Sequence, residues 1–570
     1  MKANQIRPLN LIGTECEDAR TVQSDGRLEI TFGCQSVTPA VTLHVDRLDF
    51  SDYMGMSVWV ENFGDAELTL YAMLNGNYWN HGFEIVRPGE IKPLTVLFIR
   101  PGQSREMDRY FQGMNGLPDG SMTLWNPIDP GNVRQIKIYL MAPDKEHRIR
   151  VHGVQPYRKL EVVTKEKLET GFFPFIDEYG QYRHKDWPGK VHADHDLAKQ
   201  RIAEAEDLRL NTGPGDWNRF GGWRTGPKLK ATGHFRVEKT GGKWWFVDPD
   251  GHLFWSHGVC CVRFDQATPF EGREHYFQAI PECKDFRIAN LKRKYGDGWE
   301  QTVRELSHRR LRSWGLNTLA NHSREDLCLM GKTPYTVSLE TRSWQKREFP
   351  DIENPEWERN LKDRLKKLAA KVNGDPWCLG VFIDNEIHGS TDPLRWEKYF
   401  QTVSRLVKQA FPDKLYLGCR LDHHRYPHEG PEADAIVRLA AKYCDVVSFN
   451  FYKYTLKDFV WLDGAEDKPA IIGEFHIGAP DRGLPHTGLK GAISQRHRAE
   501  AYREYVQSCL SKPQIVGAHW FQYSDQMYTG RFDGENYQIG FVDICDKPYE
   551  ELIETSRSVG YRIYEYRFDS

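Results

Sequence analysis

The feature that most constrains the fold is an alternation of short apolar segments with amphipathic helices from about residue 236 onward. Each segment is apolar and rich in β-branched residues, as expected of a strand that is buried on both faces. Eight strands that alternate with helices predict an α/β fold with a (β/α)8 TIM barrel, and an open doubly wound sheet is the alternative. The eight segments are Leu253–Val259, Leu316–Ala320, Tyr335–Leu339, Gly380–Asp384, Leu415–Cys419, Val446–Asn450, Ala470–Glu474 and Ile515–Phe521.

Two carboxylates stand at the C-terminal ends of predicted strands. Glu386 follows the fourth strand, and Glu474 ends the seventh. These ends meet at the mouth of a parallel barrel, where that fold carries its catalytic groups. Strands four and seven lie on opposite sides of the mouth, so the two carboxylates can flank one glycosidic bond. For either glutamate alone, the alternative is a helix cap or an arginine partner.

A facing pair of carboxylates predicts a glycosidase. For retaining hydrolysis the two groups must lie about 5–5.5 Å apart. One attacks the anomeric carbon, while the other protonates the leaving oxygen and then deprotonates water. The acid needs a raised pKa, which burial or the neighbouring charge can supply.

Further polar and aromatic residues lie at the same predicted strand ends. Asn385 is expected to bind a sugar hydroxyl, or else to be a structural amide. Tyr452 is expected to donate to the nucleophile, and Trp520 to form a floor on which a sugar stacks; their alternatives are a rim aromatic and a core tryptophan. The other candidates for substrate binding are Asn321, His322, His476, Gln522, Asp481 and Arg482. Asn321 and His322 could instead be caps, and the polar loop with His476, Asp481 and Arg482 could form an ion-pair network at the rim.

The chain divides into three parts by pattern. Residues 1–158 show short alternating strands separated by turn residues, which predicts a β-sandwich or jelly roll. Residues 159–235 form a connector with one helix from Asp196 to about Leu208, and its buried aromatics indicate that it packs between the domains. Residues 236–570 are the predicted catalytic barrel.

The composition excludes several classes of protein. The net charge of −3 implies no basic face, which argues against nucleic acid or an anionic membrane as a partner. Eleven scattered cysteines without a CxxC pair argue against a disulfide framework or a thiolate zinc site, and fit a reducing compartment. The first residues, Met1 to Gln5, show no apolar leader, so a cytoplasmic location is expected, or a periplasmic or secreted one if a leader was removed. The oligomeric state is left open.

Metal-dependent hydrolysis is the rival chemistry. His192, Asp194, His195 and Asp196 form one His/Asp cluster, and Asp422 to His424 form another. Neither cluster has the i, i+4 histidine pair of a zinc helix, and the first lies in the connector. No catalytic metal and no cofactor are therefore expected.

Two long motifs resemble glycoside hydrolase family 50, the β-agarases. The first runs from Ile472 to Gly483 and continues at 486–488, and the second runs from Ile515 to Tyr523 and continues at 529–531 and 534–540. The segments 233–239 and 245–252 are similar to the entry of that family's barrel. The resemblance covers roughly residues 170–550.

The resemblance implies a retaining (β/α)8 enzyme with a sandwich similar to carbohydrate-binding modules. It places the acid/base on Glu386, directly after Asn385, and the nucleophile on Glu474. It implies cleavage of β-1,4 bonds of agarose or neoagaro-oligosaccharides, from chain ends, with release of neoagarobiose. Ile387-His388-Gly389 departs from the family's Trp-Gly at this place, so porphyran, another galactan or a short β-galactoside remains an alternative substrate. A carbohydrate-binding protein without catalysis is the remaining hypothesis.

Overall fold

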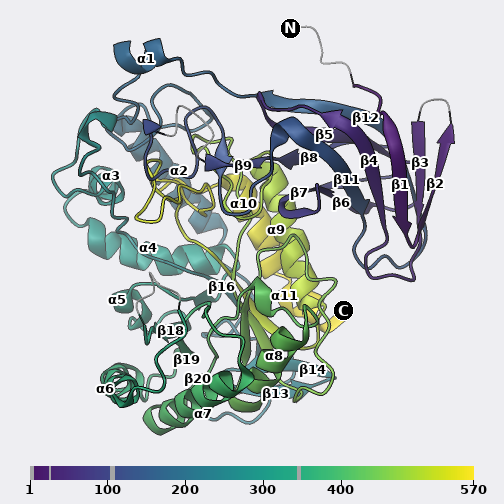
Figure 1. Cartoon of the computed structure of the whole chain (residues 1–570). Helices are drawn as coiled ribbons and strands as arrows, with labels where there is room; N and C mark the ends of the chain where they lie inside the picture. Colours follow the sequence, from purple (N-terminus) through teal and green to yellow (C-terminus); the bar gives the residue numbers. More distant parts are fainter. Residues whose placement is uncertain (1–5, 25–26, 103–108, 343–347, 570) are drawn as a thin grey trace.

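The computed structural model describes residues 6–24, 27–102, 109–342 and 348–569 (Figure 1). Residues 1–5, on which the expected absence of a leader rests, lie outside this described part. No helix among the described residues is long and apolar enough to cross a membrane.

One sheet of eight parallel strands organises the C-terminal part of the chain. Its order is β20-β19-β18-β17-β16-β23-β22-β21, and each of the eight predicted segments overlaps one of these strands. The strands are β16 (Ser256–Val259), β17 (Thr318–Leu319), β18 (Tyr335–Leu339), β19 (Cys378–Ile383), β20 (Leu415–Tyr416), β21 (Val447–Asn450), β22 (Ala470–Phe475) and β23 (Ile515–Trp520). They are buried because helices cover the sheet, as expected for an all-parallel sheet.

The sheet curls until its two terminal strands approach each other. Just after β20, the Leu421 N–H donates to the Ser448 carbonyl at 2.8 Å, and the Asn450 N–H donates to the Leu421 carbonyl at 2.8 Å. These bonds form one isolated parallel bridge, Leu421–Phe449, next to β21. The structure therefore shows a curled eight-stranded sheet, and a fully closed barrel stays a prediction.

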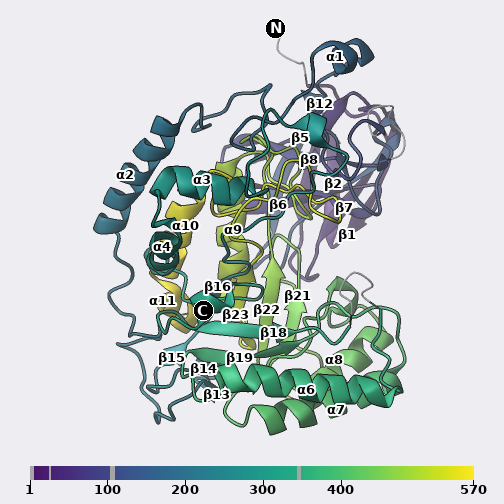
Figure 2. The ribbon, with the colours of Figure 1, turned by 90° about the vertical axis from the view of Figure 1, so that its left-hand side faces the viewer.

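Helices follow the strands and pack their apolar faces on the sheet. Figure 2 shows α6 and α7 along the outside of the sheet near β18 and β19. A three-stranded antiparallel sheet, β13 (Arg236–Thr240), β14 (Lys243–Val247) and β15 (Leu253–Phe254), precedes β16. The helices are α3 (Phe286–Tyr295), α4 (Trp299–Ser313), α5 (Glu325–Cys328), α6 (Pro355–Val372), α7 (Pro393–Ala410), α8 (Pro431–Tyr443), α9 (Gln495–Leu510), α10 (Glu550–Gly560) and α11 (Ile563–Asp569).

The N-terminal part contains two five-stranded antiparallel sheets that face each other. Their alternating apolar residues, such as Ile30 and Val58 on one sheet and Leu43 and Leu70 on the other, share one buried core. One sheet is β1 (Leu11–Glu17), β4 (Ala40–Leu48), β11 (Val133–Tyr139), β6 (Leu68–Leu74) and β7 (Asn77–Val86). The other is β2 (Ala19–Ser24), β3 (Arg27–Phe32), β12 (His147–Lys159), β5 (Tyr53–Asn62) and β8 (Ile91–Leu97). A short parallel pair, β9 (Ile99–Arg100) and β10 (Met122–Thr123), follows β8.

The connector carries α1 (Lys165–Thr170) and α2 (Asp194–Leu210), the second of which covers the predicted helix. Its aromatic side chains Phe172, Phe175 and Tyr182 share a core with Phe111 of the N-terminal part and Tyr528 of the C-terminal part. The connector thus contacts both parts, although the three domain boundaries themselves stay a prediction.

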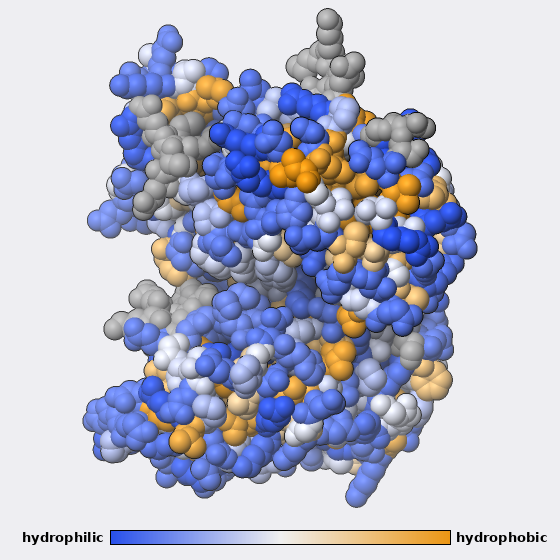
Figure 3. All heavy atoms as spheres, turned by 45° about the vertical axis from the view of Figure 1, so that its right-hand side comes forward, coloured by the Kyte–Doolittle hydropathy of each residue, from blue (hydrophilic) through white to orange (hydrophobic). Residues whose placement is uncertain are grey.

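The two-sheet part also packs directly on loops that follow the parallel strands. Lys490, which is 1% exposed, donates from Nζ to the Tyr78 carbonyl at 2.8 Å. Its ammonium lies 3.4 Å from the centre of the Tyr78 ring, a cation–π contact. The Tyr78 hydroxyl in turn donates to the Tyr452 carbonyl at 2.8 Å. On the face seen in Figure 3, the surface is mostly hydrophilic and is hollowed where its upper and lower regions meet.

Candidate active site

Glu474 is held by two donors at the C-terminal end of β22. It is 5% exposed, and Arg420 donates from Nη1 to its Oε1 at 2.7 Å. The Tyr452 hydroxyl donates to its Oε2 at 2.7 Å. Both bonds stabilise negative charge on the carboxylate, as a nucleophile requires.

Glu386 lies in the turn that follows β19 and is 8% exposed. Asn450 donates from Nδ2 to Glu386 Oε1 at 3.0 Å and to Asn385 Oδ1 at 2.9 Å. The backbone of Glu386 has a φ of 48°, and that of Asp384 has a φ of 64°. Residues other than glycine rarely adopt this left-handed backbone region, and such backbone strain is common at functional sites.

Asp384 anchors this turn from below. Its carboxylate accepts from the Thr341 N–H at 2.6 Å, from the Thr341 hydroxyl at 2.7 Å and from the Tyr399 hydroxyl at 2.9 Å. Burial raises the pKa of Asp384, and these three donors oppose that effect. A fixed Asp384 holds the two residues after it, Asn385 and Glu386, in their strained turn.

Asn450 brings the two glutamates to the same edge of the sheet. It is the register partner of Glu474 in the pairing of β21 with β22, while its side chain donates to Glu386. Burial raises the pKa of the Tyr452 hydroxyl well above its usual value, and the charges of Glu474 and then Glu386 add to this shift. Tyr452 therefore stays protonated at neutral pH and remains a donor to Glu474, while its part in catalysis stays a prediction.

Arg420 is a site residue that was not predicted from the sequence. It follows β20, has no exposed surface, and lies 3.7 Å from Glu340 as well as beside Glu474. Burial raises the pKa of Glu340 to about 7, while the charge of Arg420 opposes this shift. A signal was present, because Arg420 directly follows the fifth predicted strand, and polar residues at the other strand ends were already candidates for the same reason.

The two candidates after β17 lie next to Arg420. Asn321 is fully buried, and in the amide orientation that satisfies both its groups, its oxygen accepts from Arg420 Nη1 at 3.0 Å and its nitrogen donates to Thr336 at 3.2 Å. His322 is exposed, and its Nε2 accepts from Arg420 Nη2 at 3.3 Å. Asn321 thus positions the arginine, whereas His322 has surface that can meet a ligand.

The prediction that Trp520 forms the stacking floor is wrong. Trp520 has no exposed surface, donates from Nε1 to the Ile539 carbonyl at 2.7 Å, and packs against Tyr502 of α9. Successive side chains of a strand point to opposite faces. The preceding residue, His519, points inward and bonds Ser256 at 2.8 Å, so Trp520 points outward into the helix layer.

Two further candidates support their surroundings. His476 is 1% exposed; its Nε2 accepts from the Leu489 N–H at 2.9 Å, so its Nδ1 donates to the Phe521 carbonyl at 3.1 Å. Burial lowers the pKa of His476 to about 3, so it stays neutral, and its ring packs 4.7 Å from that of Tyr452. Gln522 is 7% exposed and donates to the Ser524 carbonyl at 2.8 Å.

Arg482 forms an ion pair, in line with the alternative of a rim ion-pair network, and its Nε lies 4.0 Å from Asp481. Asp481 accepts from the backbone and side chain of Gln495 at 3.0 and 2.8 Å, at the start of α9. Arg482 donates to Glu551 of α10 at 2.6 Å. Their role in substrate binding stays a prediction.

The His/Asp clusters of the sequence have structural contacts. Asp196 accepts from the backbone of His192 and Ala193 ahead of α2, and Asp194 accepts from the Tyr179 hydroxyl at 3.0 Å. Asp422 caps the short helix η5 (His423–Arg425) and lies 3.2 Å from His388 Nδ1. Within the described part of the chain, neither cluster forms a group that could hold a metal ion.

A parallel α/β sheet with two buried carboxylates at the ends of its strands is the arrangement that glycoside hydrolases use. In sequence, the chain is 29% identical to β-agarase B of Vibrio sp. (strain JT0107), over 77% of the chain and 59% of that protein. It is 25% identical to β-agarase A of the same strain, over 90% of the chain and 65% of that protein. No family model matches the chain.

Solved structures share the fold over nearly the whole chain. The agarase AgWH50C has a TM-score of 0.75 and 25% identity, covering 97% of this chain and 98% of its own. PfGH50B has a TM-score of 0.76 and 23% identity, covering 98% of both chains. An exo-β-agarase has a TM-score of 0.75 and 24% identity, again over 98% of both chains. The chain is therefore related in sequence to two proteins named β-agarase, although it spans only 59% and 65% of their length.

Proposed function

We propose that this protein is a retaining glycoside hydrolase of the β-agarase family that cleaves β-1,4-galactosidic bonds of agarose or neoagaro-oligosaccharides. The observation that carries the proposal is the link through Asn450, which gathers Glu386 and Glu474 at one edge of the sheet. Two relatives named β-agarase supply the substrate class. Exo action with release of neoagarobiose, and closure of the sheet into a complete (β/α)8 barrel, are parts of the same proposal.

Glu474 acts as the nucleophile in this mechanism. Arg420 and Tyr452 hold its two oxygens, so one lone pair can be aimed at the anomeric carbon while the charge stays stabilised. Glu386 donates its proton to the leaving oxygen as the glycosidic bond breaks and the bond to Glu474 forms. It then removes a proton from water, which attacks the same carbon and releases Glu474.

Asn385 is placed to help at the sugar. Its oxygen accepts from Asn450, and its side chain is half-buried beside Glu386. The amide nitrogen can then donate to a sugar hydroxyl, a bond that strengthens as positive charge develops on the ring.

The identity of the galactan depends on the residues beside the acid/base. His388, where the agarase pattern has tryptophan, is 41% exposed and pairs with Asp422. A polar imidazole in place of an indole favours a different sugar contact at this subsite. Porphyran or a short β-galactoside is therefore the alternative substrate, with the same two glutamates.

The N-terminal part contributes aromatic surface near the acid/base from β7 and from the loop after β10. Trp79 of β7 packs edge-on against His423 at 5.3 Å between ring centres. Burial lowers the pKa of His423 to about 4, and the charge of Glu386 opposes this shift. Trp125 packs against Trp79 at 5.8 Å and is 53% exposed. An exposed indole here provides a stacking surface for sugars beyond the cleaved bond.

Trp125→Ala is expected to lower kcat/KM for long agaro-oligosaccharides about tenfold, equivalent to about 1.4 kcal/mol of binding. The shortest cleavable oligosaccharide should be unaffected, because it does not reach Trp125. Ile202→Ala, which removes another exposed apolar side chain (67%) on α2, is the control. Equal losses on long and short substrates would contradict a remote stacking role.

Product analysis tests the proposed function. The pure enzyme is incubated with agarose, neoagaro-oligosaccharides, porphyran and a chromogenic β-galactoside, and the products are followed by chromatography and by proton NMR of the newly formed anomeric centre. We expect one disaccharide from agarose or its oligosaccharides, first released as the β-anomer. An initial α-anomer would exclude the retaining mechanism. Turnover of porphyran alone would show that the substrate is porphyran and not agarose. No turnover of any galactan would favour a carbohydrate-binding protein.

A further inference from the structure

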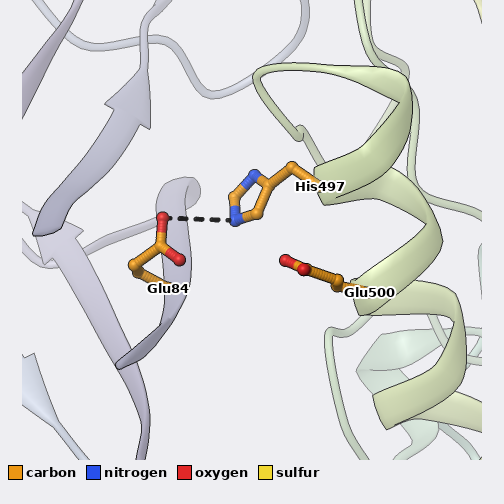
Figure 4. Close-up of side chains that lie close together, drawn as sticks. All are labelled: Glu84, His497 and Glu500. Carbon is orange, nitrogen blue, oxygen red and sulfur yellow. Dashed lines mark ion pairs between the residues drawn. The ribbon is translucent and has the colours of Figure 1, made fainter. Parts of the chain in front are cut away.

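Three potential metal ligands meet where the N-terminal sheets pack on helix α9. They are Glu84 of β7 and the pair His497 and Glu500 in the first turns of α9 (Figure 4). His497 and Glu500 are three residues apart, so they share one face of the helix. Their three ligand atoms all lie within 4.8 Å of one another.

The geometry is close to that of a bound transition metal. Zinc binds nitrogen and carboxylate oxygen at about 2.0–2.2 Å in a tetrahedron, which separates neighbouring ligand atoms by about 3.3–3.5 Å. Glu84 Oε2 and His497 Nε2 are 3.8 Å apart, too far for a hydrogen bond and near to this separation. A rotation of the half-buried Glu500 would bring in the third ligand.

His497 presents an unused ring nitrogen to this site. The side chain is 7% exposed, and its Nε2 is buried without a hydrogen-bond partner. The ring is fixed by stacking on Phe83, with 4.1 Å between ring centres and an angle of 6°. Figure 4 shows the imidazole directed toward Glu84, with Glu500 on the same side.

The local charge also favours a cation. Burial, and to a lesser extent the charge of Glu500, raise the pKa of Glu84 to about 7, and Lys92 only partly opposes this. Lys92 lies 3.4 Å from Glu84 Oε1, but its strongest contact is with the Ile85 carbonyl at 2.6 Å. When Glu84 is ionised, two carboxylates and one ammonium leave a net negative charge for a divalent ion to neutralise.

We propose that Glu84, His497 and Glu500 bind a divalent transition-metal ion of the zinc class, which clamps the N-terminal sheets to helix α9. Imidazole with two carboxylates suits zinc and its neighbours, whereas calcium and magnesium require oxygen ligands alone. Metal on Nε2 places the imidazole proton on Nδ1, so the Ile493 N–H loses Nδ1 as an acceptor, a long contact of 3.3 Å. The clamp is structural and takes no part in the hydrolysis by Glu386 and Glu474.

Zinc titration of the whole protein tests the clamp. The protein is dialysed against a chelator, transferred to chelator-free buffer near pH 7.5, and titrated with Zn²⁺ in a calorimeter. We expect one ion per chain with micromolar affinity or tighter, and a rise of several degrees in the midpoint of thermal unfolding. Hydrolysis of a short oligosaccharide should be unchanged by zinc, which separates this site from a catalytic metal.

Variants assign the site. His497→Gln and Glu500→Gln should each weaken zinc binding at least tenfold and remove the thermal shift. Glu500 is half-buried, so Glu500→Gln provides the test if His497→Gln does not fold. His192→Gln, which changes an exposed histidine 3.3 Å from Asp186, should bind zinc as the wild type does. No binding below millimolar zinc, or equal binding in wild type and Glu500→Gln, would overturn the clamp, as would a loss caused by His192→Gln.

Discussion

Glu474→Gln should lower kcat about 10⁴-fold or more, equivalent to a loss of about 5.5 kcal/mol of transition-state stabilisation. The glutamine has nearly the same shape and can still accept from Arg420, so the pocket keeps its form. It cannot form the glycosyl-enzyme intermediate, because a neutral amide is a poor nucleophile. The measurement is the steady-state rate on neoagaro-oligosaccharides, together with thermal unfolding to show that the fold survives.

A second glutamate variant provides the control for this loss. Glu305 is 42% exposed and pairs with Lys332 on the surface, so Glu305→Gln makes the same chemical change away from the site. Its rate should equal that of the wild type. If Glu474→Gln kept more than about one-hundredth of the wild-type rate, Glu474 would not be the nucleophile.

Glu386→Gln is the second large effect, and it depends on the leaving group. With natural oligosaccharides, the loss of general acid and base should lower kcat by about 10²–10⁴-fold. With a 4-nitrophenyl glycoside of the released disaccharide, the first step needs no proton. The intermediate on Glu474 should then accumulate, giving a burst of nitrophenol followed by slow turnover.

Added azide distinguishes the two glutamates. Azide needs no general base, so it should attack the intermediate in Glu386→Gln, restore the rate and yield a glycosyl azide of β configuration. Neither the wild type nor Glu474→Gln should respond. Rescue of Glu474→Gln with a glycosyl azide of retained β configuration would exchange the two assigned roles.

The strands could be predicted, and the two glutamates could be chosen as catalytic candidates, because burial leaves a local signal in the sequence. Each of the eight parallel strands overlaps a short apolar segment of the sequence, and a carboxylate at the end of such a segment is easy to recognise. The ends of strands were less certain: β20 stops at Tyr416, because Gly418 and Arg420 have φ values of 78° and 50° that leave the strand conformation. Strand propensity does not predict where a residue takes a positive φ and ends the strand.

The remaining site residues depend on pairing and on facing direction. Asn450 ends a predicted strand, yet its role follows only from the register of β21 with β22. The prediction that Trp520 lies at the mouth was wrong because neighbouring residues of β23 point to opposite faces of the sheet. A strand that is buried on both faces carries apolar residues on each, so the sequence does not show which face Trp520 takes. Glu84 and His497 are more than 400 residues apart, so no local pattern could bring them together.

The contact between Lys490 and Tyr78 limits how far the N-terminal sheets can be removed or exchanged. A lysine with 1% of its surface exposed has its carbonyl acceptor and its aromatic cover supplied by the N-terminal sheets. A version trimmed to the parallel sheet and its helices would leave this cation facing water, and would release the Tyr452 loop from its tether. The N-terminal sheets are thus a structural part of the region around Lys490 and Tyr452. If the N-terminal sheets of another enzyme were fused in their place, they would have to supply the same carbonyl and aromatic contacts to Lys490 before they could change the substrate.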